Sequence, residues 1–122
     1  MPKKNMFTVS IQRGPVYLLA IASGPADVDE NCAGIVFVAE ILRRTAVRRL
    51  LFDMTAMAPQ VGQTGVLEVM STLYANMPAL DKMAVLSPGG LAHGLVIEAA
   101  RHRNVPVREF ARACEADAWL QA

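Results

Sequence analysis

The sequence predicts an α/β fold in which a five-stranded mixed sheet is combined with four helices. Two observations support this prediction. Short apolar runs that are typical of strands alternate with longer stretches of helical periodicity. Turn and cap residues, mainly Gly, Pro, Ser and Asp, separate these segments. The 122 residues contain no internal repeat or linker, so we expect a single domain over residues 1–122.

The first two strands are expected to form an antiparallel hairpin at one edge of the sheet. Residues 6–12 alternate apolar and polar side chains, which is typical of a strand with one exposed face. Residues 13–15, Arg-Gly-Pro, have turn chemistry, because Gly permits positive φ and Pro lacks a backbone donor. Residues 16–22 are a continuous apolar run, which predicts a strand covered on both faces. Residues 23–25, Ser-Gly-Pro, are expected to end this strand.

A capping box predicts where the first helix begins. Asp27 is followed three residues later by Glu30, the reciprocal pattern that caps a helix N-terminus. Arg43 and Arg44 suit the negative end of the helix dipole, so we expect the helix to end there. The residues expected on its core-facing side are Val28, Cys32, Ile35, Val36, Ala39 and Leu42.

The remaining segments alternate between strand and helix, which predicts a mostly parallel sheet. A buried strand is expected at residues 49–54, a loop at 55–60, and a second helix from residue 61 or 62 to 76. The core side of this helix is expected to carry Val66, Leu67, Val69, Met70, Leu73, Tyr74 and Met77. The elements that complete the prediction are a strand at 82–86, a helix at 91–103, a strand at 105–110 and a last helix that packs through Ala116, Trp119 and Leu120.

Composition and charge argue against several classes of function. A formal net charge of +1 provides no overall field that would attract nucleic acid. No apolar run reaches the roughly 18 residues of a membrane span, and residues 1–7 lack the apolar stretch of a signal peptide, so we expect a cytoplasmic protein. Cys32 and Cys114 do not have metal-binding spacing and are expected to be buried, reduced thiols. No catalytic motif is evident, so we expect neither an enzyme nor a cofactor.

The C-terminal segment carries a sequence signature. It consists of the strand VREF (107–110) and the helix EADAWL (115–120). Together with the order of the elements and the strands RRLLFDM (48–54) and KMAVL (82–86), this ending resembles the SpoIIAA-like family. That family is allied to STAS domains (sulphate transporter and anti-sigma factor antagonist) and is also described as STAS/SEC14-like. The resemblance implies a (β-α)4 superhelix with its strands in sequential order and an antiparallel N-terminal edge strand.

The same resemblance implies a candidate recognition surface. In STAS antagonists the third strand ends in Asp, and the next helix opens with a motif whose serine, just before a glycine, is phosphorylated by a partner kinase. Asp53 matches that aspartate, and Thr64 stands where the serine would be, although residues 62 and 63 depart from the motif. Thr64 is therefore a candidate phosphoacceptor, with helix capping as its alternative role. The candidate recognition loop comprises Asp53, Thr55, Gln63 and Gly65. Independently of the resemblance, Asp53 is expected to cap the following loop through its side chain.

Apolar residues on the solvent side of the first helix predict a contact surface. Phe37 and Ile41 lie there, with Val38 as a further candidate. We interpret Phe37 and Ile41 as the interface of a homodimer. The alternative is a cavity for a small apolar or lipid ligand near the sheet ends, where the adaptable side chains are Met54, Met57 and Met83.

The sequence thus predicts a non-enzymatic binding or regulatory module that acts through contacts with an unidentified protein partner. The alternative function is a SEC14-like carrier of a small apolar or lipid ligand. A carrier requires an enclosed apolar pocket of about 300–1,000 Å³. A contact module requires a solid core and an exposed apolar patch.

Overall fold

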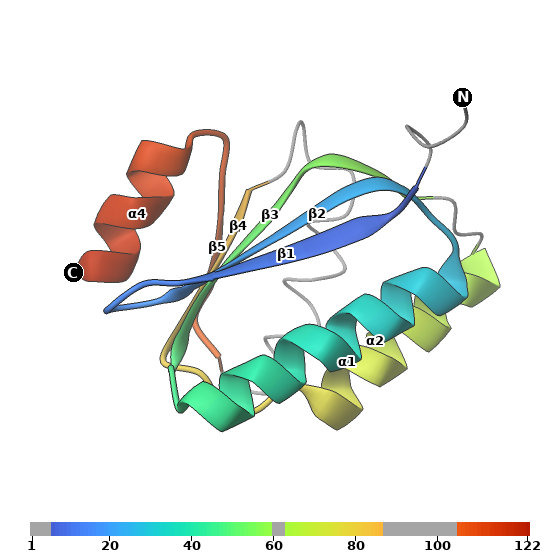
Figure 1. The fold of residues 1–122 in the computed structure, drawn as a ribbon, viewed down its shortest axis with the longest axis horizontal. Helices are drawn as coiled ribbons and strands as arrows, with labels where there is room; N and C mark the ends of the chain where they lie inside the picture. Colours follow the sequence, from blue (N-terminus) through green and yellow to red (C-terminus); the bar gives the residue numbers. More distant parts are fainter. Residues whose placement is uncertain (1–5, 60–62, 87–104) are drawn as a thin grey trace.

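The fold is described here from a computed structural model, which describes residues 6–59, 63–86 and 105–122. The helix expected at 91–103 lies outside these residues. Within them, an opening hairpin is followed by helices and strands that alternate up to residue 86, and residues 105–122 add a last strand and a last helix (Figure 1). The elements are β1 (Thr8–Arg13), β2 (Leu18–Ala26), α1 (Val28–Thr45), β3 (Arg49–Pro59), α2 (Gln63–Asn76), β4 (Lys82–Leu86), β5 (Val107–Phe110) and α4 (Ala113–Gln121).

The described strands form one five-stranded sheet in the order β1-β2-β3-β4-β5. β1 is antiparallel to β2, and every later pair of neighbours is parallel. The expected mixed sheet, its antiparallel edge strand and its sequential strand order are therefore confirmed. Because parallel neighbours need crossover connections, this order places helices against the faces of the sheet.

Helices cover both faces of the sheet (Figure 1). α1 and α2 lie side by side on one face, over a core that includes Leu50 and Val85. α4 lies on the other face, where Leu120 packs with Leu51 and Ala84. Leu50 and Leu51 are consecutive residues of β3, yet each belongs to a different core, because successive side chains of a strand point to opposite faces. The continuously apolar runs of β3 and β4 are thus buried on both sides, as predicted.

α1 begins with the capping box expected from its sequence. The Glu30 backbone N–H donates to Asp27 Oδ1 at 2.8 Å, and the Asp27 N–H donates to Glu30 Oε1 at 3.0 Å. The predicted core side is only partly correct, since Val36 is 42% exposed whereas Val38 is 1% exposed. The apolar residues of α1 cover more of its circumference than one core-facing stripe does, so helical spacing is compatible with two overlapping choices of the buried side. Packing against β2 and α2 selects the arc of Ile35, Val38, Ala39 and Leu42.

α2 occupies the predicted range, but one of its expected core residues faces solvent. Leu67 is 67% exposed, whereas Val69 and Leu73 pack against the core beneath α1 and α2. α2 packs against α1 and contributes Val69 and Leu73 to the core that both helices cover, so only a limited arc of it can be buried. The apolar residues of α2 at positions 66, 67, 69 and 70 are spread over a wider arc than the one that can be buried.

β2 and β3 are longer than predicted. Residues 23–25 continue β2 rather than ending it, and residues 55–59 continue β3 rather than forming a loop. Beyond Leu86, the last residue of β4, these two extensions pair with each other through Ser23 to Ala26 and Ala56 to Pro59. The turn-forming residues are tolerated because Gly24 adopts a φ of +89° and Pro59, which lacks an N–H, comes at the end of its strand.

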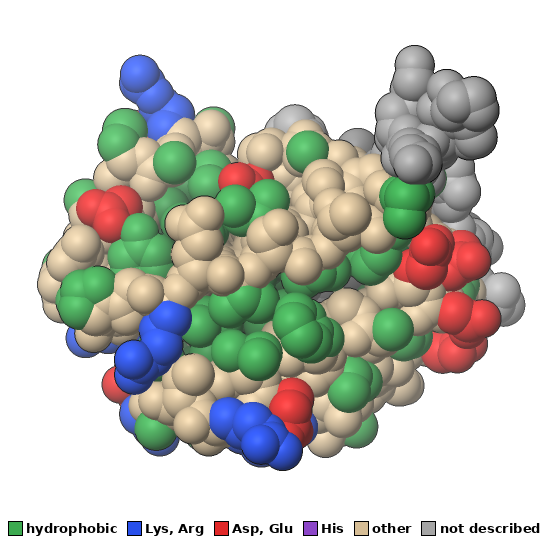
Figure 2. All heavy atoms as spheres, in the orientation of Figure 1, with side chains coloured by type: hydrophobic (Ala, Val, Ile, Leu, Met, Phe, Trp, Pro, Cys, Tyr) green, Lys and Arg blue, Asp and Glu red, His purple; other side chains and the backbone are tan. Residues whose placement is uncertain are grey.

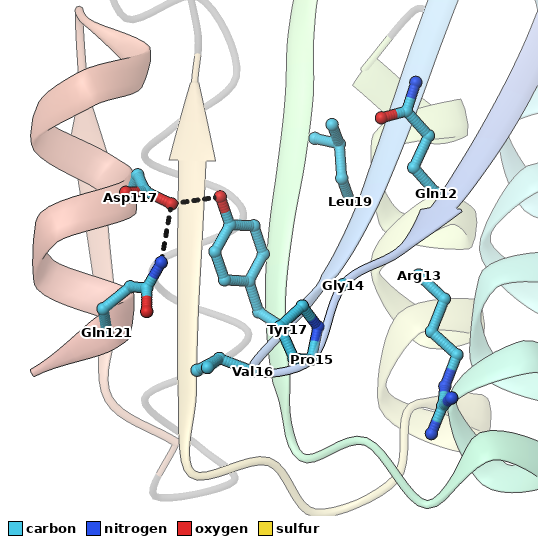
Figure 3. A pocket seen from close by; sticks show the side chains of 9 residues that line it. All are labelled: Gln12, Arg13, Gly14, Pro15, Val16, Tyr17, Leu19, Asp117 and Gln121. Carbon is cyan, nitrogen blue, oxygen red and sulfur yellow. Dashed lines mark hydrogen bonds between the residues drawn. The ribbon is translucent and has the colours of Figure 1, made fainter.

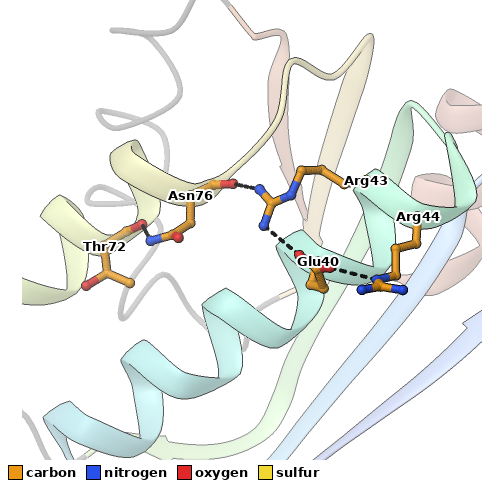
Figure 4. A network of polar contacts seen from close by, with 5 residues as sticks. All are labelled: Glu40, Arg43, Arg44, Thr72 and Asn76. Carbon is orange, nitrogen blue, oxygen red and sulfur yellow. Dashed lines mark hydrogen bonds and ion pairs between the residues drawn. The ribbon is translucent and has the colours of Figure 1, made fainter.

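Arg43 of α1 makes a hydrogen bond to the C-terminus of α2 (Figure 4). Arg43 Nη1 donates to the Asn76 carbonyl at 2.6 Å, at the C-terminus of α2. The last turn of α2 contains no basic residue, so Arg43 provides the cation that favours this end of the helix dipole. Glu40 holds Arg43 and Arg44 at 3.0 and 2.7 Å, respectively.

Replacing Gly24 should destabilise the fold. A Cβ at this position would overlap the carbonyl oxygen of Met6, and the positive φ is unfavourable for any other residue. We expect Gly24→Ala to lower the free energy of unfolding by about 1–3 kcal/mol, measured by urea denaturation. Gly34→Ala is the matched control: its Cβ would contact the Phe7 ring at 3.4 Å, and Ala favours a helix interior by about 1 kcal/mol. Equal losses in the two variants would contradict this reasoning.

Candidate functional site

Asp53 lies where β3 changes its register with β2. Ile21 pairs with Asp53, but Ser23 pairs with Ala56, so β3 has one extra residue at this bulge. Asp53 Oδ1 accepts hydrogen bonds from the Thr55 backbone N–H at 3.0 Å and from Thr55 Oγ1 at 2.7 Å. The carboxylate thus provides an acceptor for an N–H where the ladder is interrupted. The local capping by Asp53 is present as expected, although the segment that it caps is a strand.

The candidate recognition residues lie on two elements rather than on one loop. Asp53 and Thr55 belong to β3, whereas Gln63, Thr64 and Gly65 belong to the first turn of α2. Gly65 is buried. The N–H groups of this turn have no partner within the helix, and the turn contains no Asp or Glu.

Leu67 lies one turn of α2 after Thr64 and is 67% exposed, which is more than any other large apolar side chain that the structure describes. The sequence pattern placed Leu67 in the core, so this surface was missed. The available signal was the excess of apolar residues over what one face of α2 can bury.

The two residues of the candidate dimer interface have different environments. Phe37 is 45% exposed, but Ile41 is half-buried and packs against the core beneath α1 and α2. Val38, the further candidate, is fully buried, and Val36 takes its place at the surface. Only Phe37 of the predicted residues is therefore available to a partner as a largely exposed side chain.

A cleft lies between the β1–β2 turn and α4 (Figure 3). Its volume is about 290 Å³. Tyr17 Oη donates to Asp117 Oδ1 at 2.6 Å, and Gln121 Nε2 donates to the same oxygen at 3.3 Å. Arg13, at the edge of the cleft, points away from Asp117 (Figure 3). The residues that line the cleft are Gln12, Arg13, Gly14, Pro15, Val16, Tyr17, Leu19, Asp117 and Gln121. The cleft is open and mixed in polarity, so it does not provide the enclosed apolar pocket that a lipid carrier requires.

Tyr17 holds the hairpin turn against α4. Burial, the hydrogen bond to Asp117 and the charge of that carboxylate raise the pKa of Tyr17 to about 12. The phenol is therefore protonated at neutral pH and acts as a donor to Asp117. This direction of shift leaves less phenolate at neutral pH to act as a general base, so the pair has the character of a structural contact.

Three cations surround the C-terminus of α4. Lys82 Nζ donates to the Trp119 carbonyl at 2.8 Å and lies 5.1 Å from the centre of the Trp119 ring. Arg49 Nη1 donates to the Leu120 carbonyl. The Arg108 guanidinium lies 5.6 Å from the Trp119 ring and 5.2 Å from the Phe110 ring. Lys82 and Arg49 satisfy two carbonyls at the negative dipole end of α4, and Arg108 lies over the two aromatic rings, which explains how the C-terminal signature is held on the sheet.

The cysteines and acidic residues do not form a metal site in the part of the chain that the structure describes. There, no three His, Cys, Asp or Glu side chains are grouped closely enough to hold an ion. Both cysteines are free, but their expected burial is wrong for Cys114, which is exposed. Cys32 is half-buried and accepts a hydrogen bond from Thr72 Oγ1 at 3.2 Å. Among the described helices, none combines the length and hydropathy needed to span a bilayer.

Comparisons with known proteins support the fold. Neither a family model nor a curated protein matches the sequence. Among solved structures, an uncharacterized protein of the DUF3478 family from Shewanella loihica PV-4, described as SpoIIAA-like in fold, is 15% identical with a TM-score of 0.66 over 93% of both chains. An anti-sigma factor antagonist from Mycobacterium paratuberculosis is 13% identical with a TM-score of 0.65 over 97% of both chains. The predicted SpoIIAA-like fold is therefore confirmed.

The contact between Tyr17 and Asp117 predicts a pH dependence of stability. The pKa of Tyr17 is about 12 in the folded protein against 10.0 for an ordinary tyrosine, so the folded state retains this proton longer than the unfolded state does. The stabilisation from Tyr17 should be complete below pH 10 and should fall as the pH rises toward 12. We expect the difference in unfolding free energy between wild type and Tyr17→Phe to shrink over this range.

Asp117→Asn serves as the second variant. It keeps the shape of the side chain but removes the charge, so it should reduce the pH dependence while burial of Tyr17 preserves part of it. A difference between wild type and Tyr17→Phe that is the same on both sides of pH 10 would show that the contact does not perturb Tyr17.

Proposed function

We propose that this protein is a non-enzymatic regulatory module that binds a protein partner through the beginning of α2. The observation that carries this proposal is the exposure of Leu67, one turn after Thr64. The Leu67 side chain is 67% exposed, so a partner that covers it removes apolar surface from water, which favours binding. In protein interfaces, the side chains that anchor the contact fill well-packed pockets from which water is excluded.

The similarity in fold supports a protein as the partner. The structurally similar protein from Mycobacterium paratuberculosis is named an anti-sigma factor antagonist, a name that describes action on another protein. Our chain shares its fold over nearly the full length of both. We propose the same kind of role for this chain, namely regulation by binding rather than by catalysis.

Thr64 is our candidate for the residue that switches this surface. It is the second residue of α2, where backbone N–H groups are free of intrahelical partners. A phosphate in this turn would meet these donors and the positive end of the helix dipole. The turn has no Asp or Glu that would repel the phosphate. Because Leu67 is one turn away, the added charge would change the surface that the partner contacts.

The alternative function, a carrier of a small apolar or lipid ligand, receives no support from the cleft beside α4. That cleft is open, and its walls include two Gln side chains and the carboxylate of Asp117. The core residues of the two sheet faces are closely packed against helices.

Phosphorylation of Thr64 can be tested directly. If a neighbouring gene encodes a protein kinase, the protein is incubated with that kinase and ATP, and phosphopeptides are identified by mass spectrometry. We expect phosphate on Thr64 in the wild type and none in Thr64→Ala. Thr8→Ala removes an exposed threonine of β1, outside the candidate recognition loop, and is the control that should leave the reaction unchanged. Modification at another residue, or no modification, would refute the phosphoacceptor role.

The contribution of Leu67 is measured separately by calorimetric titration of the same kinase with the unphosphorylated protein. Leu67→Ser should raise the dissociation constant about tenfold, because it removes an apolar anchor without disturbing the core. Val36→Ser is the matched control, since Val36 is exposed on α1 instead. Equal affinities of wild type and Leu67→Ser would place the binding surface elsewhere.

A further inference from the structure

Helix α1 leaves one continuous face in solvent. At 100° per residue, its exposed positions fall within a single stripe, opposite the buried residues Ile35, Val38 and Leu42. We call this stripe the outer face of α1. Its members are Asp29, Glu30, Ala33, Val36, Phe37, Glu40, Arg43 and Arg44.

The centre of the outer face is apolar. Val36 and Phe37 are adjacent in the sequence and are 42% and 45% exposed. Figure 2, which views the molecule in the orientation of Figure 1, shows hydrophobic side chains gathered along α1. An aromatic and a β-branched side chain together at the middle of a solvent-facing helix are typical of a contact surface.

The two ends of the outer face carry opposite charges. Asp29 and Glu30 lie in the first turn, and Arg43 and Arg44 lie in the last turn. Acidic side chains gather at the end of the molecule where α1 begins, and basic side chains lie where it ends (Figure 2). This polarity favours the helix dipole, but the dipole alone does not explain the exposed apolar centre between the charges.

These features are related by symmetry about the midpoint between Val36 and Phe37. Asp29 and Arg44 are equally distant from it, and so are Glu30 and Arg43. A two-fold axis through this point, perpendicular to α1, would place the acidic turn of one copy against the basic turn of the other. The same operation would place Val36 of one copy against Phe37 of the other. A surface that is complementary to itself under a two-fold rotation is what an isologous dimer requires.

The ion pairs within α1 are compatible with this arrangement. Glu40 engages Arg43 and Arg44 in one chain, yet the Arg44 side chain remains 76% exposed. Exposed ion pairs of this kind contribute little to stability, so Arg44 can reorient toward a second carboxylate at small cost.

We propose that the outer face of α1 is a self-association surface on which a second copy of this chain docks with its α1 antiparallel to the first. The occupant is a second copy because both the charges and the apolar centre match under the rotation that relates two identical chains. This proposal concerns a different helix from the surface around Leu67 and does not depend on the function proposed for it.

The first test measures self-association by sedimentation equilibrium over a range of concentrations. We expect the wild type to dimerise and Phe37→Glu to raise the dimer dissociation constant at least about a hundredfold, because the substitution buries two charges at the centre of the contact. Leu67→Glu introduces the same charge at an exposed leucine of α2 and should leave the dimer intact. Circular dichroism shows whether both variants retain the fold. A monomeric wild type, or a dimer that survives Phe37→Glu, would overturn the proposal.

The second test determines the orientation of the helices. In the antiparallel dimer, Arg44→Glu replaces two attractive pairs by two repulsive ones and should weaken the dimer about tenfold. Asp29→Arg should weaken the dimer by a similar factor, because it places an arginine opposite Arg44 of the other copy. A mixture of these two variants should form a heterodimer, detected by native mass spectrometry, because the introduced charges then face each other.

Arg112→Glu is the control for charge, because it changes the net charge by the same amount as Arg44→Glu does. Arg112 is exposed at the beginning of α4, away from the outer face of α1. The substitution should not alter the dimer. In a parallel dimer, each of these positions would face its own copy, so Arg44→Glu would replace one like-charged pair by another. An unchanged dissociation constant for Arg44→Glu would therefore exclude the antiparallel arrangement.

Discussion

The structure depends on covering a sheet whose central strands are apolar on both faces. In β3, Leu50 and Leu51 are both buried, and each needs a different layer of helices above it. α1 and α2 provide one layer. Among the residues that the structure describes, the other layer is α4 (Ala113–Gln121), which is held at its C-terminus by Lys82 and Arg49. Because β3 and β4 are apolar on both faces, the second face must also be covered, and the C-terminal signature with its Trp and Leu covers it.

Once both faces of the sheet are covered, the chain has apolar residues left over. α1 and α2 each have room for only part of their apolar side chains against the sheet and against each other. Val36, Phe37 and Leu67 remain in solvent as a result. These residues lie on two separate helices, so the domain presents two surfaces, one around the start of α2 and one along α1. Both proposals made for this protein follow from this surplus rather than from any catalytic group.

Much of the fold could be predicted because its signals are local. The capping box of Asp27 and Glu30, the continuous apolar runs of β3 and β4, and the apolar spacing in α4 that includes Leu120 are patterns among residues close together in the chain, and all of them are present. The recognition residues were harder to place. Thr55 was expected to begin a loop directly after the strand that contains Asp53, because short polar residues favour turns. Thr55 lies in the strand instead because β2 continues alongside β3, a pairing between residues far apart in the sequence.

The sequence by itself determined the class of fold and most of the helix and strand segments, because periodicity and caps act over a few residues. The order of the strands was implied by the resemblance to the SpoIIAA-like family. The tertiary structure decided which apolar residues of α1 and α2 are buried. Spacing allowed both Val36 and Val38 in the core, and contact with the sheet and the neighbouring helix chose Val38. The tertiary structure also decided that Lys82, Arg49 and Arg108 meet at the end of α4, since no local rule brings residues of three different strands to the end of the last helix. Long-range packing was required for these outcomes, because only the assembled layers define which side of each helix is inside.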